Sequence, residues 1–247
     1  MGLAAQFTYN FASRYFIDYN FGYNGSENFA DGHRWGFFPA WSVAWNVGEE
    51  PWIKNKVSWM DMFKIRFSHG KVGSDATGSN RFPYLYTLEN SGNGYIWGQN
   101  GQNSYGSVRY RQVASNNVTW EVATKNDLGI DLVLFNNKFS LTLDYVDEKR
   151  TGIFQERKYL PTTVGLEYWD SNGWNYPKAN VGSVKSRGFD GNFSYTDKFG
   201  DVGVTVRVNI TYSKNKIGDY DEENNVYAYQ NQTGYRVDQV RGLIALG

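Results

Sequence analysis

Apolar and polar residues alternate along most of this chain with a period of two, which is typical of β-strands that have one apolar and one polar face. Between Tyr15 and Tyr23 the odd positions are apolar or aromatic, whereas the even positions include Asp18, Asn20 and Gly22. The alternation recurs at residues 3–11, 37–47, 63–68, 120–134, 139–145, 189–195 and 202–212. We therefore expect about eight strands, most of them near the roughly 9 to 11 residues that a tilted strand needs to cross a bilayer. A short helical stretch is predicted around residues 49–59.

The connections between the predicted strands alternate in length. Short connections are expected at residues 12–14, 135–137 and 196–201, and long ones at 25–34, 71–117 and 151–180, with an intermediate one at 48–61. In an antiparallel meander successive connections lie at opposite ends, so the long ones gather at one end. Outer-membrane barrels have this arrangement. The aromatic residues at predicted strand ends fit the girdles of such barrels at the membrane interface; they are Tyr15, Tyr23, Phe37 and Tyr212.

The fold class predicted by these patterns is all-β, an antiparallel meander. A soluble β-sandwich that binds or degrades glycans is the alternative, because two sheets could bury the same apolar faces against each other. Tyrosines spread along the apolar face favour the barrel, since each buried tyrosine hydroxyl would need a hydrogen-bond partner. The barrel requires Ile17, Tyr19, Val206 and Val208 to point outward from a single curved sheet, whereas the sandwich requires them to meet a second sheet.

Composition excludes several classes of protein. The 247 residues include 25 basic and 25 acidic ones, so the net charge is zero and nucleic acid is not an expected partner. The absence of cysteine excludes disulfides, thiolate metal sites and a cysteine nucleophile. No apolar run approaches the roughly 18 residues of a membrane-spanning helix, which excludes a helical membrane bundle.

Several motifs follow one another along nearly the whole chain. They are RYF at 14–16, YNGSENF at 23–29, RWGFFP at 34–39, FKIRFSHGKVGSD at 63–75, NVTWE at 117–121, GID at 129–131, VKSRGFDG at 184–191 and YSKNK at 212–216. In this order and at these intervals they resemble the barrel region of SusC/RagA-like TonB-dependent outer-membrane transporters. The segment 90–106 and the end of the chain match the family only loosely.

The resemblance implies that residues 1–247 form an incomplete segment of a 22-stranded transmembrane β-barrel. The plug domain, the signal peptide and the closing C-terminal strands of the family would lie outside the chain. By resemblance the whole protein is not an enzyme but an importer in the bacterial outer membrane. It would take up oligosaccharides or peptides with TonB-derived energy, with TonB acting through the missing plug region and a SusD-like surface lipoprotein as partner. A passive porin without a plug is the nearer alternative.

Two groups of candidate site residues follow from this interpretation. Aromatic residues among asparagines and glycines in the long connections could stack on sugar faces, although they could equally pack the loops over the barrel mouth; they are Tyr84, Tyr86, Tyr95, Trp97, Tyr105, Trp169, Trp174 and Tyr176. Polar residues opposite the apolar face would face the lumen and line the cargo path, or pair with one another across strands; they are Asp18, Asn20, Lys64, Arg66, Asp144, Arg207 and Asn209.

Catalytic and metal-binding patterns are poor. The two histidines, His33 and His69, belong to no His-Glu-x-x-His motif, and no Gly-x-Ser-x-Gly motif occurs. Adjacent acids such as Glu49 and Glu50 would point to opposite faces of a strand and so are no glycosidase pair. The acidic run at 219–223 could hold calcium through its oxygens, but a solvated loop is the simpler interpretation. We expect no catalytic residue, no metal and no cofactor.

Overall fold

The computed structural model describes residues 1–247 except 79–80, 162, 164–167, 171–172, 224–226 and 243–247. Its main feature is one large antiparallel sheet of eight strands. In spatial order they are β1 (Gly2–Phe11), β2 (Tyr15–Gly25), β3 (Trp35–Asn46), β4 (Met60–Ser74), β7 (Glu121–Leu134), β8 (Phe139–Glu156), β11 (Lys178–Phe199) and β12 (Val202–Asp219). The predicted eight-stranded meander is thus confirmed.

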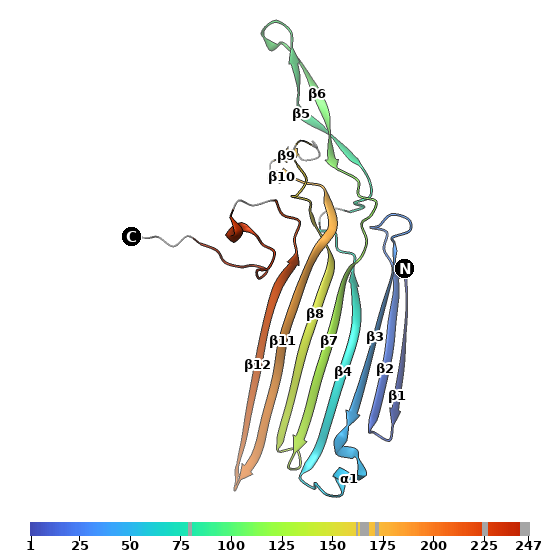
Figure 1. The fold of residues 1–247 in the computed structure, drawn as a ribbon, viewed down its shortest axis with the longest axis vertical. Coiled ribbons are helices and arrows are strands. Elements are labelled where there is room, and N and C mark those ends of the chain that lie inside the picture. Colours follow the sequence, from blue (N-terminus) through green and yellow to red (C-terminus); the bar gives the residue numbers. More distant parts are fainter. Residues whose placement is uncertain (79–80, 162, 164–167, 171–172, 224–226, 243–247) are drawn as a thin grey trace, which may run out of the picture.

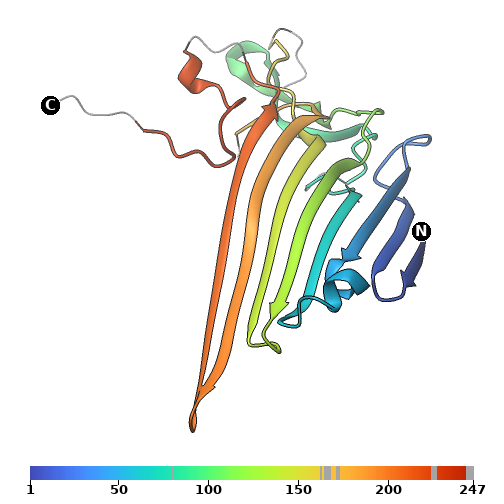
Figure 2. The ribbon, with the colours of Figure 1, turned by 60° about the horizontal axis from the view of Figure 1, so that its bottom comes forward.

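The sheet is open and curved (Figures 1 and 2). The order of the strands in the sheet follows their order along the chain. The first and last of them, β1 and β12, form the two unpaired edges. Such an arrangement is an incomplete segment of a β-barrel wall, because a complete barrel has no edge strands.

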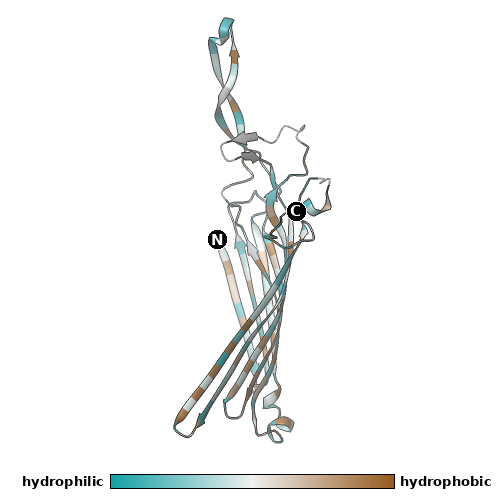
Figure 3. Cartoon of the chain, turned by 90° about the vertical axis from the view of Figure 1, so that its left-hand side faces the viewer, coloured by the Kyte–Doolittle hydropathy of each residue, from teal (hydrophilic) through white to brown (hydrophobic). Residues whose placement is uncertain are grey.

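The register places apolar residues in rows that cross the sheet. One row runs through all eight strands and contains Tyr9, Ile17, Val43, Phe67, Leu128, Tyr145, Phe189 and Tyr212. Because side chains alternate between the faces of a strand, the polar residues that precede and follow each member of this row along its strand lie on the opposite face. We call these two surfaces the apolar face and the polar face; Figure 3 shows the resulting alternation of hydropathy along the strands.

The apolar face is accessible on every strand: seven strands carry exposed apolar side chains, and those of β4 are half-buried. Ile17, Tyr19, Val206 and Val208 keep 46%, 40%, 46% and 42% of their surface accessible, and no second sheet in the described part of the chain covers them. The largest fully buried side chains among the described residues are Phe29 and Val118, which both lie outside the strands. This result excludes the β-sandwich, in which the same residues would form a dry core.

The connections divide between two ends of the sheet. Turns at 12–14, 135–138 and 200–201, together with a 3₁₀ turn η1 (Val47–Glu49) and the short helix α1 (Pro51–Lys54), lie at what we call the turn end. The connections 26–34, 75–120 and 157–177 and the C-terminal segment lie at the loop end (Figure 1). The predicted segregation of short and long connections is confirmed. Among the described residues, the helices fall short of the length and apolar character that a bilayer-spanning helix requires.

Two features were not predicted. The long connections contain two hairpins, β5 (Thr87–Trp97) with β6 (Asn103–Gln112) and β9 (Tyr168–Asp170) with β10 (Gly173–Asn175), and short 3₁₀ turns at Gln99–Gly101 (η2) and Ala228–Gln230 (η4). In addition β8, β11 and β12 extend several residues past the predicted ends. The extensions and the hairpins mix polar residues with scattered apolar ones, such as Leu88, Ile96 and Val108, so they carry no sustained alternation from which a strand could be predicted.

Candidate functional site

The polar face carries a network of charges centred on Arg66. Its guanidinium donates to Asp131 at 2.7 Å and to Asp144 at 2.9 Å. The three residues come from β4, β7 and β8, and Gly129 lies between Arg66 and Asp144 in the register. A Cβ on Gly129 would be 2.3 Å from Asp144 Oδ1 and 2.7 Å from Arg66 Cζ, so the glycine makes room for the ion pair. The sequence indicated Arg66 and Asp144 but not the second carboxylate, Asp131.

The other candidate lumen residues lie on the same face as Arg66. Asp18 accepts a hydrogen bond from Ser42 at 3.2 Å, and the Lys64 ammonium lies 4.3 Å from the centre of the Phe16 ring. Arg207 and Asn209 are exposed on β12. Cross-strand pairing, the simpler of the two interpretations, accounts for Asp18, Arg66 and Asp144, whereas Arg207 and Asn209 remain accessible. That this face lines a lumen stays a prediction.

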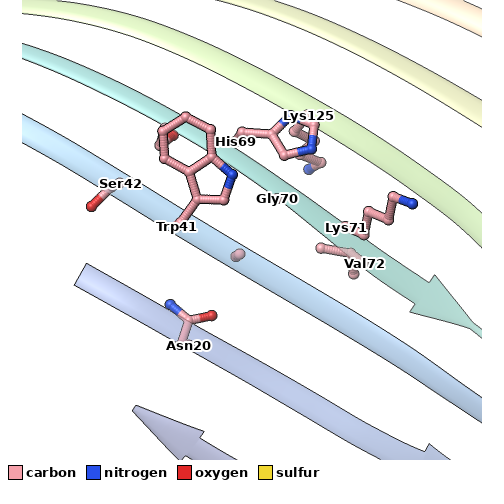
Figure 4. Close-up of a pocket in the computed structure, with 10 residues that line it drawn as sticks. Asn20, Trp41, Ser42, His69, Gly70, Lys71, Val72 and Lys125 are labelled. Atoms are coloured by element: carbon pink, nitrogen blue, oxygen red, sulfur yellow. The ribbon is translucent and has the colours of Figure 1, made fainter. Parts of the chain in front are cut away.

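A shallow pocket of about 280 Å³ opens where small residues of the central strands meet. Asn20, Ala40, Gly70 and Lys125 stand in one register row across β2, β3, β4 and β7, and all four line it (Figure 4). Two of the four have little or no side chain, which leaves a hollow between the amide of Asn20 and the ammonium of Lys125. Such a hollow can accept a polar group on the polar face, and it contains only one of the predicted site residues, Asn20.

Three of the eight candidate loop aromatics lie on the hairpin β5–β6, which projects away from the sheet in Figure 1. Tyr95 and Tyr105 are direct register partners, and the Trp97 and Tyr105 rings lie 6.1 Å apart. All three are more than half exposed, as is Tyr86, whose ring is 5.6 Å from that of Tyr110. Tyr110 was missed because it lies in a polar segment. The hairpin therefore presents open aromatic faces, which suits stacking on a ligand.

The remaining loop candidates are placed less fully. Tyr84 contacts Phe82 edge to face at 6.3 Å, and Tyr176 lies 6.0 Å from the Lys158 ammonium. Trp169 and Trp174 are register partners in β9–β10, while their side chains fall outside the described residues. The structure thus brings Tyr95, Trp97 and Tyr105 together on one hairpin. Tyr84 and Tyr176 contact other residues and do not join this group.

A buried cluster fixes the loops to the sheet at the loop end. Trp120 packs edge to face on Phe29 at 5.5 Å and on Phe38 at 5.1 Å, and its indole nitrogen donates to the Arg34 carbonyl at 3.0 Å. The Asn180 amide accepts from the Thr119 backbone N–H at 2.9 Å and donates to the carbonyl of the same residue, also at 2.9 Å. We call Phe29, Val118, Trp120 and Asn180 the loop anchor. It joins residues 26–34 and 117–120 to β11 and so holds the base of the longest loop.

A second cluster surrounds Glu50 at the turn end. Its carboxylate accepts hydrogen bonds from the Tyr15 hydroxyl at 2.7 Å and the Trp45 indole at 3.0 Å, and it pairs with Arg14 at 3.3 Å. Glu49 instead pairs with Lys54, so the two adjacent acids contact different partners and do not act as a pair. The hydrogen bonds from Tyr15 and Trp45, helped by Arg14, lower the pKa of Glu50 below its ordinary value of 4.5 against the opposing effect of burial.

We expect acid to weaken this cluster. Because the folded-state pKa of Glu50 is depressed, its contribution to stability is present above about pH 4.5 and is lost as the pH falls through the folded-state pKa. Replacing Glu50 with glutamine should therefore lower the free energy of unfolding more at pH 7 than at an acid pH well below 4.5. Urea unfolding at both pH values measures this, with Glu49→Gln as the control. An equal loss from Glu50→Gln at both pH values would contradict the prediction.

The acidic side chains of residues 219–222 form hydrogen bonds and an ion pair within the protein. Asp219 accepts from the Ser183 hydroxyl at 2.6 Å, Asp221 pairs with Arg157, and Glu222 accepts from the Gln232 backbone N–H at 2.6 Å. In the described part of the chain no group of three or more histidine, cysteine or acidic side chains is arranged to hold a metal. The run therefore fastens the C-terminal segment to the loop end.

The fold and its two faces define a class of protein. An open sheet with an exposed apolar face, a polar reverse face and all long connections at one end is a segment of a transmembrane β-barrel. The comparisons with known proteins narrow this class. No family model matches the chain. TonB-dependent receptor P39 of Formosa agariphila is 25% identical over 96% of the chain, and TonB-dependent receptor SusC of Bacteroides thetaiotaomicron is 26% identical over 85%.

Solved structures give the same result for the fold. The RagAB peptide importer in its closed-closed state superposes on 95% of the chain with a TM-score of 0.73 at 16% identity, and a second RagAB peptide transporter structure covers 88% with a TM-score of 0.70. The resemblance to SusC/RagA-like TonB-dependent transporters that the motifs indicated is thus confirmed. The chain spans about a fifth of the length of the curated relatives, 22% and 20% of P39 and SusC.

Proposed function

We propose that this chain is part of the barrel wall of a bacterial outer-membrane importer that takes up oligosaccharides or peptides. The whole protein would use TonB-derived energy, act with a SusD-like surface lipoprotein and have no enzymatic activity. A plug domain, through which TonB acts, and further strands would complete it. One observation carries the proposal: a continuous apolar face, exposed on seven strands and half-buried on β4, lies opposite a polar face.

The apolar face supports placement in a membrane because of its free-energy cost in water. Each exposed valine or phenylalanine on it keeps about half of its surface accessible and would gain part of the roughly 1.5–3 kcal/mol that full burial of such a side chain provides. In the described part of the chain no protein segment covers it, so lipid is the partner that fits. The polar face then borders an aqueous lumen, and its exposed Arg207 and Asn209 are available to cargo or to a plug.

The cargo is proposed from the loop end. RagAB is described as a peptide importer, which supports peptide, whereas the exposed rings of β5–β6 suit the faces of sugars. Exposed aromatic rings can stack on sugar faces and on apolar peptide side chains, so the same hairpin could hold either. Binding of a panel of oligosaccharides and peptides to the full-length protein separates them.

We expect the double substitution Trp97→Ala and Tyr105→Ala to weaken cargo binding by roughly 30-fold, because each ring contributes on the order of 1 kcal/mol by stacking. Calorimetry with the full-length protein and its best cargo measures the change. Trp52→Ala is the matched control, since this ring is equally exposed at 59% but lies at the turn end. Unchanged affinity in the double variant would show that these rings only pack the loop.

The alternative of a passive porin is tested separately. An importer driven by TonB needs a plug domain and a TonB box encoded upstream, and its uptake should stop when the proton-motive force is dissipated. Uptake that continues unchanged in such cells would favour the porin, and the assignment of this chain to a barrel wall would still hold.

A further inference from the structure

Cationic side chains gather on the apolar face toward the loop end. Lys149, Lys185 and Lys216 are direct neighbours in one register row across β8, β11 and β12. The next row toward the turn end contains Asp147, Arg187 and Lys214 on the same three strands. We call Lys149, Lys185, Arg187, Lys214 and Lys216 the cationic band.

The side-chain alternation places this band on the lipid-facing side. The row that follows Asp147, Arg187 and Lys214 holds Tyr145, Phe189 and Tyr212, which are each about half exposed and belong to the apolar face. Phe189 and Tyr212 are stacked at 5.6 Å. Moving toward the loop end in steps of about 7 Å, two residues along a strand, the surface changes from aliphatic to aromatic to cationic. This is the order expected where a barrel leaves the hydrocarbon core.

The protein balances one of the five charges of the band. Asp147 pairs with Arg187 at 2.5 Å, and the four lysines form no ion pair within the described part of the chain. All five cations are exposed. Like charges directly opposite each other on neighbouring strands are destabilising. Three adjacent lysines in one row therefore favour an external anion that lies across more than one of them.

We propose that the cationic band binds the phosphate groups of a phosphorylated lipid headgroup in the membrane leaflet at the loop end. This inference rests on the proposed function, because it takes the apolar face to lie in lipid. The aromatic row fixes the depth of the hydrocarbon edge, and the cations stand immediately beyond it, where lipid phosphates lie. Lys149, Lys185 and Lys216 span two strand spacings, about 10 Å, so they can contact two phosphates of one headgroup.

The experiment uses the full-length protein in detergent and measures lipid binding by native mass spectrometry. The probes are lipid A with both phosphates and the same lipid after enzymatic dephosphorylation. The test variant is Lys149→Gln, Lys185→Gln and Lys216→Gln together. A matched control removes three cations from the polar face, Lys125→Gln, Lys198→Gln and Arg207→Gln. Replacement of the same three band lysines by arginine keeps the charge and tests for rescue.

We expect roughly 100-fold weaker binding of the diphosphorylated lipid by the glutamine variant, wild-type binding by the arginine and polar-face variants, and weak binding of the dephosphorylated lipid throughout. Heat-modified mobility on gels confirms that each variant is folded. Equal affinity for the two lipids would overturn the proposal, as would full binding by the folded glutamine variant or an equal loss in the polar-face variant.

The same variants separate this inference from the proposed function. Cargo binding should be unchanged in the glutamine variant, because the band lies on the opposite face from Arg207 and Asn209. If the wild-type protein binds the phosphorylated lipid through the band but binds no oligosaccharide or peptide, the importer proposal fails and the lipid site stands.

Discussion

Replacing Val208 with arginine is expected to lower the free energy of unfolding by about 2–4 kcal/mol, because a cation would be forced into the hydrocarbon near the middle of the bilayer. Val208 lies on the apolar face of β12, opposite Phe193 of β11, and keeps 42% of its surface exposed. Urea unfolding of the full-length protein in lipid vesicles measures the loss.

The neighbouring residue provides the control. Asn209 follows Val208 in the same strand and lies on the polar face, opposite Asn192. Asn209→Arg should change the free energy of unfolding by less than about 1 kcal/mol, since surface substitutions away from packed groups have small effects. If both arginine variants lose the same stability, or if only Asn209→Arg does, the assignment of the two faces is wrong.

Phe29→Ala is expected to cost about 3–5 kcal/mol, because it removes a fully buried ring from the loop anchor and leaves a cavity. Phe29 is 1% exposed and packs against Trp120. Because the anchor holds residues 26–34 and 117–120 to the sheet, the loss should be local as well as global. Hydrogen exchange at the Thr119 amide, which donates to Asn180, should become faster.

An exposed ring at the same end of the molecule is the control for this prediction. Tyr227 is 57% exposed and contacts Tyr229 by stacking. Tyr227→Ala should leave both the free energy of unfolding and exchange at Thr119 nearly unchanged. Wild-type exchange at Thr119 in the Phe29→Ala protein would show that the cluster does not fasten the loops.

Placement in a membrane can be checked against the direction of the register rows. The row that contains Phe7, Tyr19 and Trp41 in β1–β3 continues as His69, Asn126, Asp147, Arg187 and Lys214 in β4–β12. A single row thus changes from apolar to charged as it crosses the sheet. Strands tilted by roughly 40° produce this result, because a row perpendicular to them rises through a flat membrane.

Much of the site was beyond prediction from sequence. Lys64, Arg66 and Asp144 were identified as polar-face residues because each alternates with apolar neighbours. The ion pairs of Arg66 with Asp131 and Asp144 were not predicted. The two carboxylates are 65 and 78 positions from Arg66 in the sequence and meet it only through the register of β4, β7 and β8. The hairpin β5–β6 was missed because tyrosines among asparagines and glycines carry no periodic signal.

Residue patterning was enough to predict the strands of the wall and which face of each strand is apolar. A period of two is a local property, so eight strands, two faces and the alternation of short and long connections could be read from adjacent residues. The folded structure was needed to show that no second sheet in the described part of the chain covers Ile17 and Val208, that Phe29 and Trp120 belong to the loop anchor, and that three lysines stand side by side. Each of these depends on strand order and register, which bring together residues far apart in the chain and are fixed only when the whole sheet forms.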